Sequence, residues 1–260
     1  MKHGGFPWIE SKDQFDYSIK HALIGSYKAA IDHLRSCLEL SLVSVYFAFQ
    51  EDTAEHWSVQ ENIKAFFEKE KRWLNSLSNT PFFSEMKKLI SENHRIKKIN
   101  QNHTWLNELS KTYGALSDYT HIKGFSYGIQ NLSSPDIRIS GSSIPKIETS
   151  SLDKYLCLLI QTVEHIVVLT SLYNPIILIE LPLTEKFGIN EPIGFIHPGQ
   201  TEIVNELINV KYKIFFEQLK NEDEDIASII EWVNSRPDLT DADIQKQIED
   251  FNDLLYKKEA

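Results

Sequence analysis

The 260-residue sequence is poor in the residues that build disulfide frameworks and phosphate-binding loops. It has only two cysteines, Cys37 and Cys157. Each lies in an apolar helical stretch outside any CxxC pattern, which predicts reduced, buried thiols of a cytosolic protein. No GxGxxG or GxxxxGK[ST] sequence occurs, so the common nucleotide-binding loops are excluded. HExxH is missing as well, which excludes the familiar zinc-protease signature. We therefore expect no cofactor.

Metal-binding spacing is also missing. The chain has nine histidines, but no two of them lie three or four residues apart, as two ligands on one helical face would. This pattern predicts no metal site.

Long uninterrupted apolar runs are absent too. The two most apolar stretches, residues 37–49 and 155–181, are broken by Glu39, Glu164 and Pro175 among others. This pattern predicts no membrane span. The first residues, MKHGGFPWIE, lack the apolar core of a secretory signal, and we expect a cytoplasmic location.

The sequence has fewer basic than acidic residues. The formal net charge is -10, from 27 basic and 37 acidic residues. Residues 217–260 contain 13 acidic and 5 basic residues, so this end alone carries -8. A balance of this kind does not favour nucleic acid or an anionic membrane as partner, and we expect a protein partner or a homodimer instead.

What the sequence does contain is helical periodicity, with enough apolar residues (42%) for a sizeable core. It predicts an all-α fold, a bundle of long helices followed by an irregular crossover and a smaller acidic helical C-terminal part. We expect residues 1–175 to form the bundle, and residues 176–260 to form the crossover and the acidic helices packed on it. The expected bundle helices are residues 15–49, a helix from Ser58, one from Pro81 capped by Thr80, residues 94–121, and one from Ser150 or Ser151 to Tyr173.

The remaining segments are less regular. Residues 124–151 are rich in serine and predict a long loop, and residues 175–200 predict a loop with a short strand. Residues 201–221 fit a strand or a helix equally well. Two acidic helices are expected at about 222–234 and 241–257, the second with the T-x-x-D capping spacing at Thr240 and Asp243.

One set of polar residues interrupts the apolar helix faces. Arg35 and Glu39 lie one turn apart on the first long helix, and Ser117, Asp118 and His121 lie at the end of the helix over 94–121. If the two helices pack together, His121 could meet Glu39 while Arg35 meets Asp118. A carboxylate beside an imidazole raises the imidazole pKa, which can tune a general acid or base. The simpler interpretation is a polar clasp that sets the register of the two helices.

The segments LRSCLELSLVSVYF (34–47), TPFF (80–83) and YGALSDYTH (113–121) resemble a group of bacterial all-helical proteins. In that group an LRxxLE helix precedes an LSxYxH helix, and the group is similar in outline to the HEPN superfamily of helical-bundle domains. The resemblance covers about residues 15–175. It implies a ribonuclease site with an RxxxxH motif, often assembled across a dimer. His121 matches the histidine, but Leu116 occupies the arginine position, so the motif is broken.

Three functions follow as expectations. The first is a non-enzymatic interaction protein, with a role in bacterial phage defence or a toxin–antitoxin pair implied by the resemblance. The second is a divergent HEPN-like ribonuclease that uses His121 and Arg35. The third is a small-molecule sensor with its pocket in the bundle.

Overall fold

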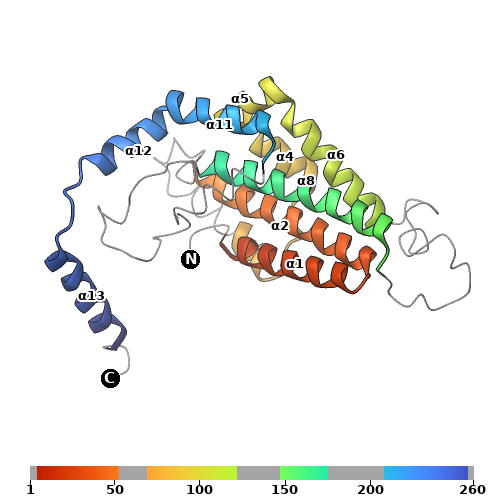
Figure 1. Ribbon diagram of the computed structural model, residues 1–260, viewed down its shortest axis with the longest axis horizontal. Coiled ribbons are helices and arrows are strands. Elements are labelled where there is room, and N and C mark those ends of the chain that lie inside the picture. Colours follow the sequence, from red (N-terminus) through yellow and green to blue (C-terminus); the bar gives the residue numbers. More distant parts are fainter. Residues whose placement is uncertain (1–4, 53–68, 122–146, 175–207, 257–260) are drawn as a thin grey trace, which may run out of the picture. The chain divides into compact units, whose positions relative to one another are not determined.

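Helices make up all the regular secondary structure of the described residues (Figure 1). The computed structural model describes residues 5–52, 69–121, 147–174 and 208–256. The predicted all-α class is confirmed. The chain divides into two units, Met1–Tyr173 and Asn174–Ala260, each of which is described by itself.

Helix α2 (Tyr27–Asp52) is the centre of the first unit. Four helices pack against it: α1 (Gly5–Leu23), α4 (Phe83–Ile90), α6 (Trp105–Thr120) and α8 (Thr149–Tyr173). Figure 1 shows α1, α2 and α8 side by side. Apolar residues on several sides of α2 are fully buried, among them Ile31, Leu34, Leu38, Leu42 and Phe47. Each such side chain stabilises the fold by about 1.5–3 kcal/mol, so α2 supplies much of the core.

The predicted single helix over residues 15–49 is wrong, because the chain turns back at Gly25. This glycine has φ 78°, in the left-handed region that L side chains rarely adopt. Its N–H donates to the carbonyl of Ala22, and the N–H of Ser26 donates to the carbonyl of His21. This is the Schellman arrangement that ends helices, so α1 and α2 form an antiparallel hairpin. Residues 5–14, which lie before the predicted helix, belong to α1.

The predicted helix over residues 94–121 is also two helices, α5 (His94–His103) and α6. Thr104 separates them with φ 52°. Asn93 caps α5, because its side chain accepts hydrogen bonds from the N–H groups of Arg95 and Ile96. Gly114 lies within α6, which continues through it.

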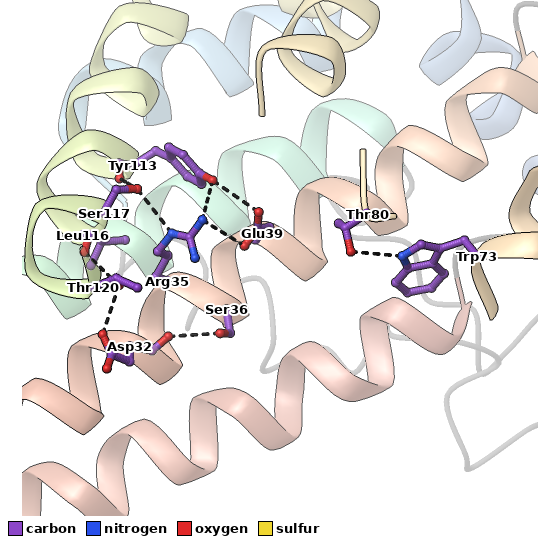
Figure 2. Close-up of polar contacts among 10 residues, drawn as sticks. All are labelled: Asp32, Arg35, Ser36, Glu39, Trp73, Thr80, Tyr113, Leu116, Ser117 and Thr120. Atoms are coloured by element: carbon purple, nitrogen blue, oxygen red, sulfur yellow. Dashed lines mark hydrogen bonds and ion pairs between the residues drawn. The ribbon is translucent and has the colours of Figure 1, made fainter. Parts of the chain in front are cut away.

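Helix α4 begins later than predicted, at Phe83, with Phe82 at the N-cap position. Thr80 does not cap it. Its hydroxyl oxygen instead accepts a hydrogen bond from the indole Nε1–H of Trp73 at 3.1 Å (Figure 2). An indole seven residues earlier thus binds the oxygen that the sequence pattern assigned to the helix end.

Helix α8 ends at Tyr173, as predicted, and lies against α2 and α6. By length and composition alone it is apolar enough to cross a membrane, a test that core helices of soluble proteins also pass. It buries Tyr155, Leu158, Val168, Leu169 and Leu172 within the first unit. Cys157 lies on its exposed face, so the expectation of a buried thiol holds for Cys37 and is wrong for Cys157.

The second unit contains α11 (Val210–Glu222), α12 (Glu224–Asn234) and α13 (Asp241–Tyr256). Helix α11 settles the ambiguity over residues 210–221 in favour of a helix, and it packs against α12. The two acidic helices are confirmed as α12 and α13. Most of the helix expected from Ser58, most of the serine-rich loop and the short strand expected after Pro175 lie outside the described residues. Residues 69–74, near the end of the helix expected from Ser58, are helical.

Candidate functional site

Arg35 is the centre of a polar cluster between α2 and α6 (Figure 2). Its Nε–H donates to the Ser117 hydroxyl at 3.2 Å, and its Nη2 donates to the Tyr113 hydroxyl at 2.9 Å. The same Nη2 lies 3.4 Å from a carboxylate oxygen of Glu39. We call Arg35, Glu39, Tyr113 and Ser117 the Arg35 cluster.

Tyr113 holds the cluster together from the α6 side. Its hydroxyl donates to Glu39 at 3.2 Å, and the guanidinium carbon of Arg35 lies 5.3 Å from the centre of its ring. On α4, the ring of Phe83 stacks on Tyr113 with centroids 4.0 Å apart and planes 7° apart. Burial raises the pKa of Tyr113 above its ordinary value, and the charge of Glu39 adds to this effect, so the phenol stays neutral at pH 7.

The cluster follows from two pairs of residues at helical spacing. Arg35 and Glu39 are one turn apart on α2, and Tyr113 and Ser117 are one turn apart on α6. The side chains of Arg35 and Glu39 keep 19% and 22% of their surface exposed. The ion pair is therefore half-buried, and hydrogen bonds from a second helix supplement it.

Polar contacts between α2 and α6 continue towards the start of α2, and we call this contact between the two helices the seam. The hydroxyl of Thr120 donates to Asp32 at 3.0 Å, and Lys28 pairs with Asp32 at 3.1 Å. Figure 2 shows Asp32 and Arg35 reaching the same stretch of α6. The seam between α2 and α6 is therefore polar and paired along its length, as a contact that sets helix register would be.

The structure separates His121 from Glu39, with which the sequence predicted a contact. His121 is the C-cap residue of α6 and is exposed, and among the described residues no hydrogen bond or ion pair joins it to Arg35 or Glu39. The predicted pairing of Arg35 with Asp118 is wrong, because Arg35 binds other residues of α6. Arg35 is bonded to Ser117, the neighbour of Asp118, and to Tyr113 one turn earlier.

Of the predicted site residues, the structure brings Arg35, Glu39 and Ser117 together. It adds Tyr113, which was not among the predicted site residues. The signal for Tyr113 was present in the spacing, since Tyr113, Ser117 and His121 recur every four residues on one face of α6. The sequence identified the correct face of α6. It predicted that His121 meets Glu39, whereas Tyr113 and Ser117 make the contacts with Arg35 and Glu39.

Two other polar groups lie in the first unit. Tyr46 donates to Glu85 at 2.6 Å, and Lys69 bonds both of them. Deeper in the core, the Nε2 atom of His165 on α8 lies 3.0 Å from the Thr112 hydroxyl on α6. Each group joins helices, and neither adds a residue to the Arg35 cluster.

The chemistry open to the Arg35 cluster is limited by its own bonding. A cation that stabilises charge on a substrate needs donors free to reach it, but two donors of Arg35 are committed to Ser117 and Tyr113. Glu39, the one metal-ligand type within this cluster, accepts from Tyr113 and pairs with Arg35. The arrangement fits a structural clasp better than a catalytic centre.

Comparisons of the chain with protein-family models, with curated proteins and with solved structures found no match. The resemblance to the HEPN superfamily stays a prediction.

Proposed function

We propose that this chain is a non-enzymatic helical interaction protein. The observation that carries the proposal is α13, an acidic amphipathic helix with no extensive packing against α11 or α12, the other described helices of its unit. A helix in a globular protein is normally held by packing of its apolar face. When that face is left open, it is available to a partner.

Helix α13 is stabilised from within. The Asp243 carboxylate accepts hydrogen bonds from the Thr240 hydroxyl at 2.7 Å and from its backbone N–H at 3.0 Å. In return, the N–H of Asp243 donates to the Thr240 hydroxyl oxygen at 3.3 Å. This reciprocal capping box satisfies backbone donors that the first turn would otherwise leave open. These bonds lower the pKa of Asp243, which keeps its charge beside the positive end of the helix.

In the sequence of α13, apolar residues recur at the spacing of one helical face. Ile244, Ile248, Phe251 and Leu255 follow one another at spacings of four, three and four residues. Ile248 is half-exposed. Asp241, Asp243, Glu249, Asp250 and Asp253, with Lys246 as the one basic residue, give the helix a charge of -4. A fitting partner is a protein with an apolar groove rimmed by lysine or arginine.

Exposed apolar side chains in the first unit support the same class of function. Phe6 contacts Trp73 edge-on, with ring centroids 6.2 Å apart, and keeps about half of its surface exposed. Leu77 and Phe82, which follow Trp73 in the chain, are 65% and 76% exposed. Large apolar residues exposed together are common at protein interfaces. If the predicted resemblance holds, the setting is bacterial phage defence or a toxin–antitoxin pair.

The proposal is tested by capturing binding partners with the full chain after crosslinking, and comparing two variants. Ile248→Asp places a charge in the apolar stripe, whereas Ala242→Asp adds the same charge at an exposed position on the other side of α13. We expect a protein that is retained by the parent and by Ala242→Asp and lost from Ile248→Asp. Identical protein profiles from all three would contradict the proposal.

A divergent ribonuclease is the second candidate, and one observation favours it. Ser117, which bonds Arg35, lies one turn before His121 on α6, so the cation and the exposed imidazole belong to the same end of the seam. A substrate phosphate that drew Arg35 away from Glu39 would let the guanidinium of Arg35 and the imidazole of His121 act on the same substrate. A cleavage assay separates this candidate from the first.

A further inference from the structure

Two histidines face each other across the hairpin of α1 and α2. The rings of His21 and His33 are stacked, with centroids 5.1 Å apart and planes 12° apart. The ring of Tyr17 lies 5.5 Å from His33. Two neutral imidazoles stack readily, but two imidazolium ions at this distance repel each other, and partial burial strengthens the repulsion.

The hydrogen bonds of the pair suit neutral rings. The Nδ1 atom of His33 lies 2.7 Å from the side-chain oxygen of Gln14, which assigns a proton to this nitrogen. The Nδ1 atom of His21 is buried and has no hydrogen-bond partner among the described residues. If His21 became an imidazolium, this nitrogen would be a charged donor without an acceptor, which is a costly state.

The charged groups around His33 only partly offset its preference for the neutral state. Burial lowers the pKa of His33 most, and the neighbouring His21 lowers it further, while Asp32 on α2 raises it. Asp32 is already paired with Lys28 and bonded by Thr120 of α6. On α1, Lys20 lies over the ring of Tyr17 and adds positive charge nearby. Helix α8 contributes the neutral phenol of Tyr155, which bonds Ser18 on α1.

Helix α1 is held to its neighbours with little apolar burial. The α1 residues that are buried are Pro7, Ser11, Ser18 and Ala22. The hydroxyl of Ser11 contacts that of Ser41 at 2.7 Å, and Ser18 donates to the carbonyl of Ala30 at 2.8 Å. These polar contacts tie α1 to α2, and separation of α1 would break them.

We propose that the His21–His33 pair is a pH-sensitive latch between α1 and α2. At neutral pH the two rings are stacked and α1 is docked. In mildly acidic solution His33 takes up a proton, which its partly buried place in the stack disfavours, so the stack breaks and α1 leaves α2 while the other helices of the first unit stay folded. Separation uncovers the Cys37 thiol, which lies 3.4 Å from the Ser11 hydroxyl in the docked state. This device is independent of the proposed function.

The test is the reactivity of Cys37 in the full chain carrying Cys157→Ser, which removes the exposed thiol. A dithiodipyridine reagent, which reacts with thiols in acid, is applied on both sides of the ordinary histidine pKa, at pH of about 7.5 and about 5.5. Each rate is divided by that of the protein unfolded in urea at the same pH. We expect the ratio to rise on the order of tenfold in acid, because protonation favours the state in which α1 is separated from α2.

Two variants assign the effect to the pair. His21→Gln with His33→Gln removes both imidazole rings of the stack, and we expect the ratio to stay constant with pH. His94→Gln removes an exposed histidine of α5, and the acid-induced rise should remain. A rise that persists in the double variant, or no rise in the protein with both histidines, would overturn the proposal.

A second measurement covers the case in which the double variant does not fold. Hydrogen exchange of the protein with native histidines is followed at both pH values and expressed as protection factors, which correct for the intrinsic effect of pH. The latch predicts that α1 amides lose protection in acid while α6 amides keep theirs. Equal loss in both helices would mean global unfolding, and no loss in α1 would mean that no latch exists.

Discussion

Arg35 and Tyr113 meet in two ways across the seam of α2 and α6. The guanidinium donates to the phenol oxygen at 2.9 Å, and its carbon lies 5.3 Å from the centre of the same ring. The hydroxyl of Tyr113 in turn donates to Glu39. The cluster therefore links a cation, an anion and a neutral hydroxyl from two helices, and the loss of any one of them leaves the others short of a partner.

Replacing Glu39 with alanine should lower the free energy of unfolding by about 1–2 kcal/mol. A fully buried ion pair that loses one partner costs about 3–5 kcal/mol, but Glu39 keeps 22% of its side chain exposed and water can partly compensate. The measurement is urea unfolding at neutral pH. The matched control is Asp153→Ala on the exposed face of α8, which should change stability by less than about 0.5 kcal/mol. Equal effects of the two variants would mean that the cluster is not a clasp.

Tyr113→Phe removes one hydroxyl and leaves the ring stacked on Phe83. We expect a loss of about 1–2 kcal/mol, since both Arg35 and Glu39 lose a hydrogen bond. A double-mutant cycle with Glu39→Ala should show coupling above about 0.5 kcal/mol. Additive effects would show that the two residues act independently.

The group of Tyr46, Lys69 and Glu85 predicts a pH-dependent contribution to stability. Hydrogen bonds from Tyr46 and then Lys69 lower the pKa of Glu85 below its ordinary value. A carboxyl whose pKa is lower when folded stabilises the protein above its unfolded pKa of about 4.3, and this contribution is lost as pH falls through the folded pKa.

Glu85→Gln should therefore cost about 0.2–1 kcal/mol at pH 7, because the pair with Lys69 is largely exposed. The difference from the parent should shrink towards zero in strong acid. Urea unfolding at pH 7 and in acid measures this difference in the free energy of unfolding. The control is Glu92→Gln, which replaces an exposed glutamate. A difference that does not change with pH would contradict the assignment.

The two thiols should differ in reactivity at neutral pH. Burial raises the pKa of Cys37, and little of it is present as the reactive thiolate, whereas Cys157 is exposed on α8. Labelling with a maleimide should modify one thiol rapidly and the second only after unfolding. Mass spectrometry of the labelled peptides identifies them. Rapid labelling of Cys37 at neutral pH would show that α1 does not cover it there.

The helical class and several helix ends were predictable because their signals are local. Thr240 and Asp243 carry a capping box in four residues, and the apolar periodicity of residues 150–173 does not depend on the rest of the chain. Gly25 lies inside the predicted helix over residues 15–49, and the left-handed conformation that turns the chain there became clear only from its φ angle and the hydrogen bonds around it.

The candidate site was less predictable because its contacts are distant in the sequence. The i, i+4 pair of Arg35 and Glu39 could be identified, and so could the polar face of α6. Which turn of that face meets Arg35 depends on how far α6 slides along α2, and no short pattern encodes that distance. Thr80 shows the same limit, since its partner is Trp73 rather than the helix that follows it.

The claim that this protein acts by binding and not by cleavage is tested most directly by incubating the purified chain with total RNA, beside a His121→Ala variant. Cleavage needs a positioned base and a cation for the phosphate, and Arg35 is held by Glu39, Tyr113 and Ser117. We predict no cleavage above a protein-free blank from either protein. Cleavage by the parent that disappears in His121→Ala would contradict the account and make the chain a ribonuclease.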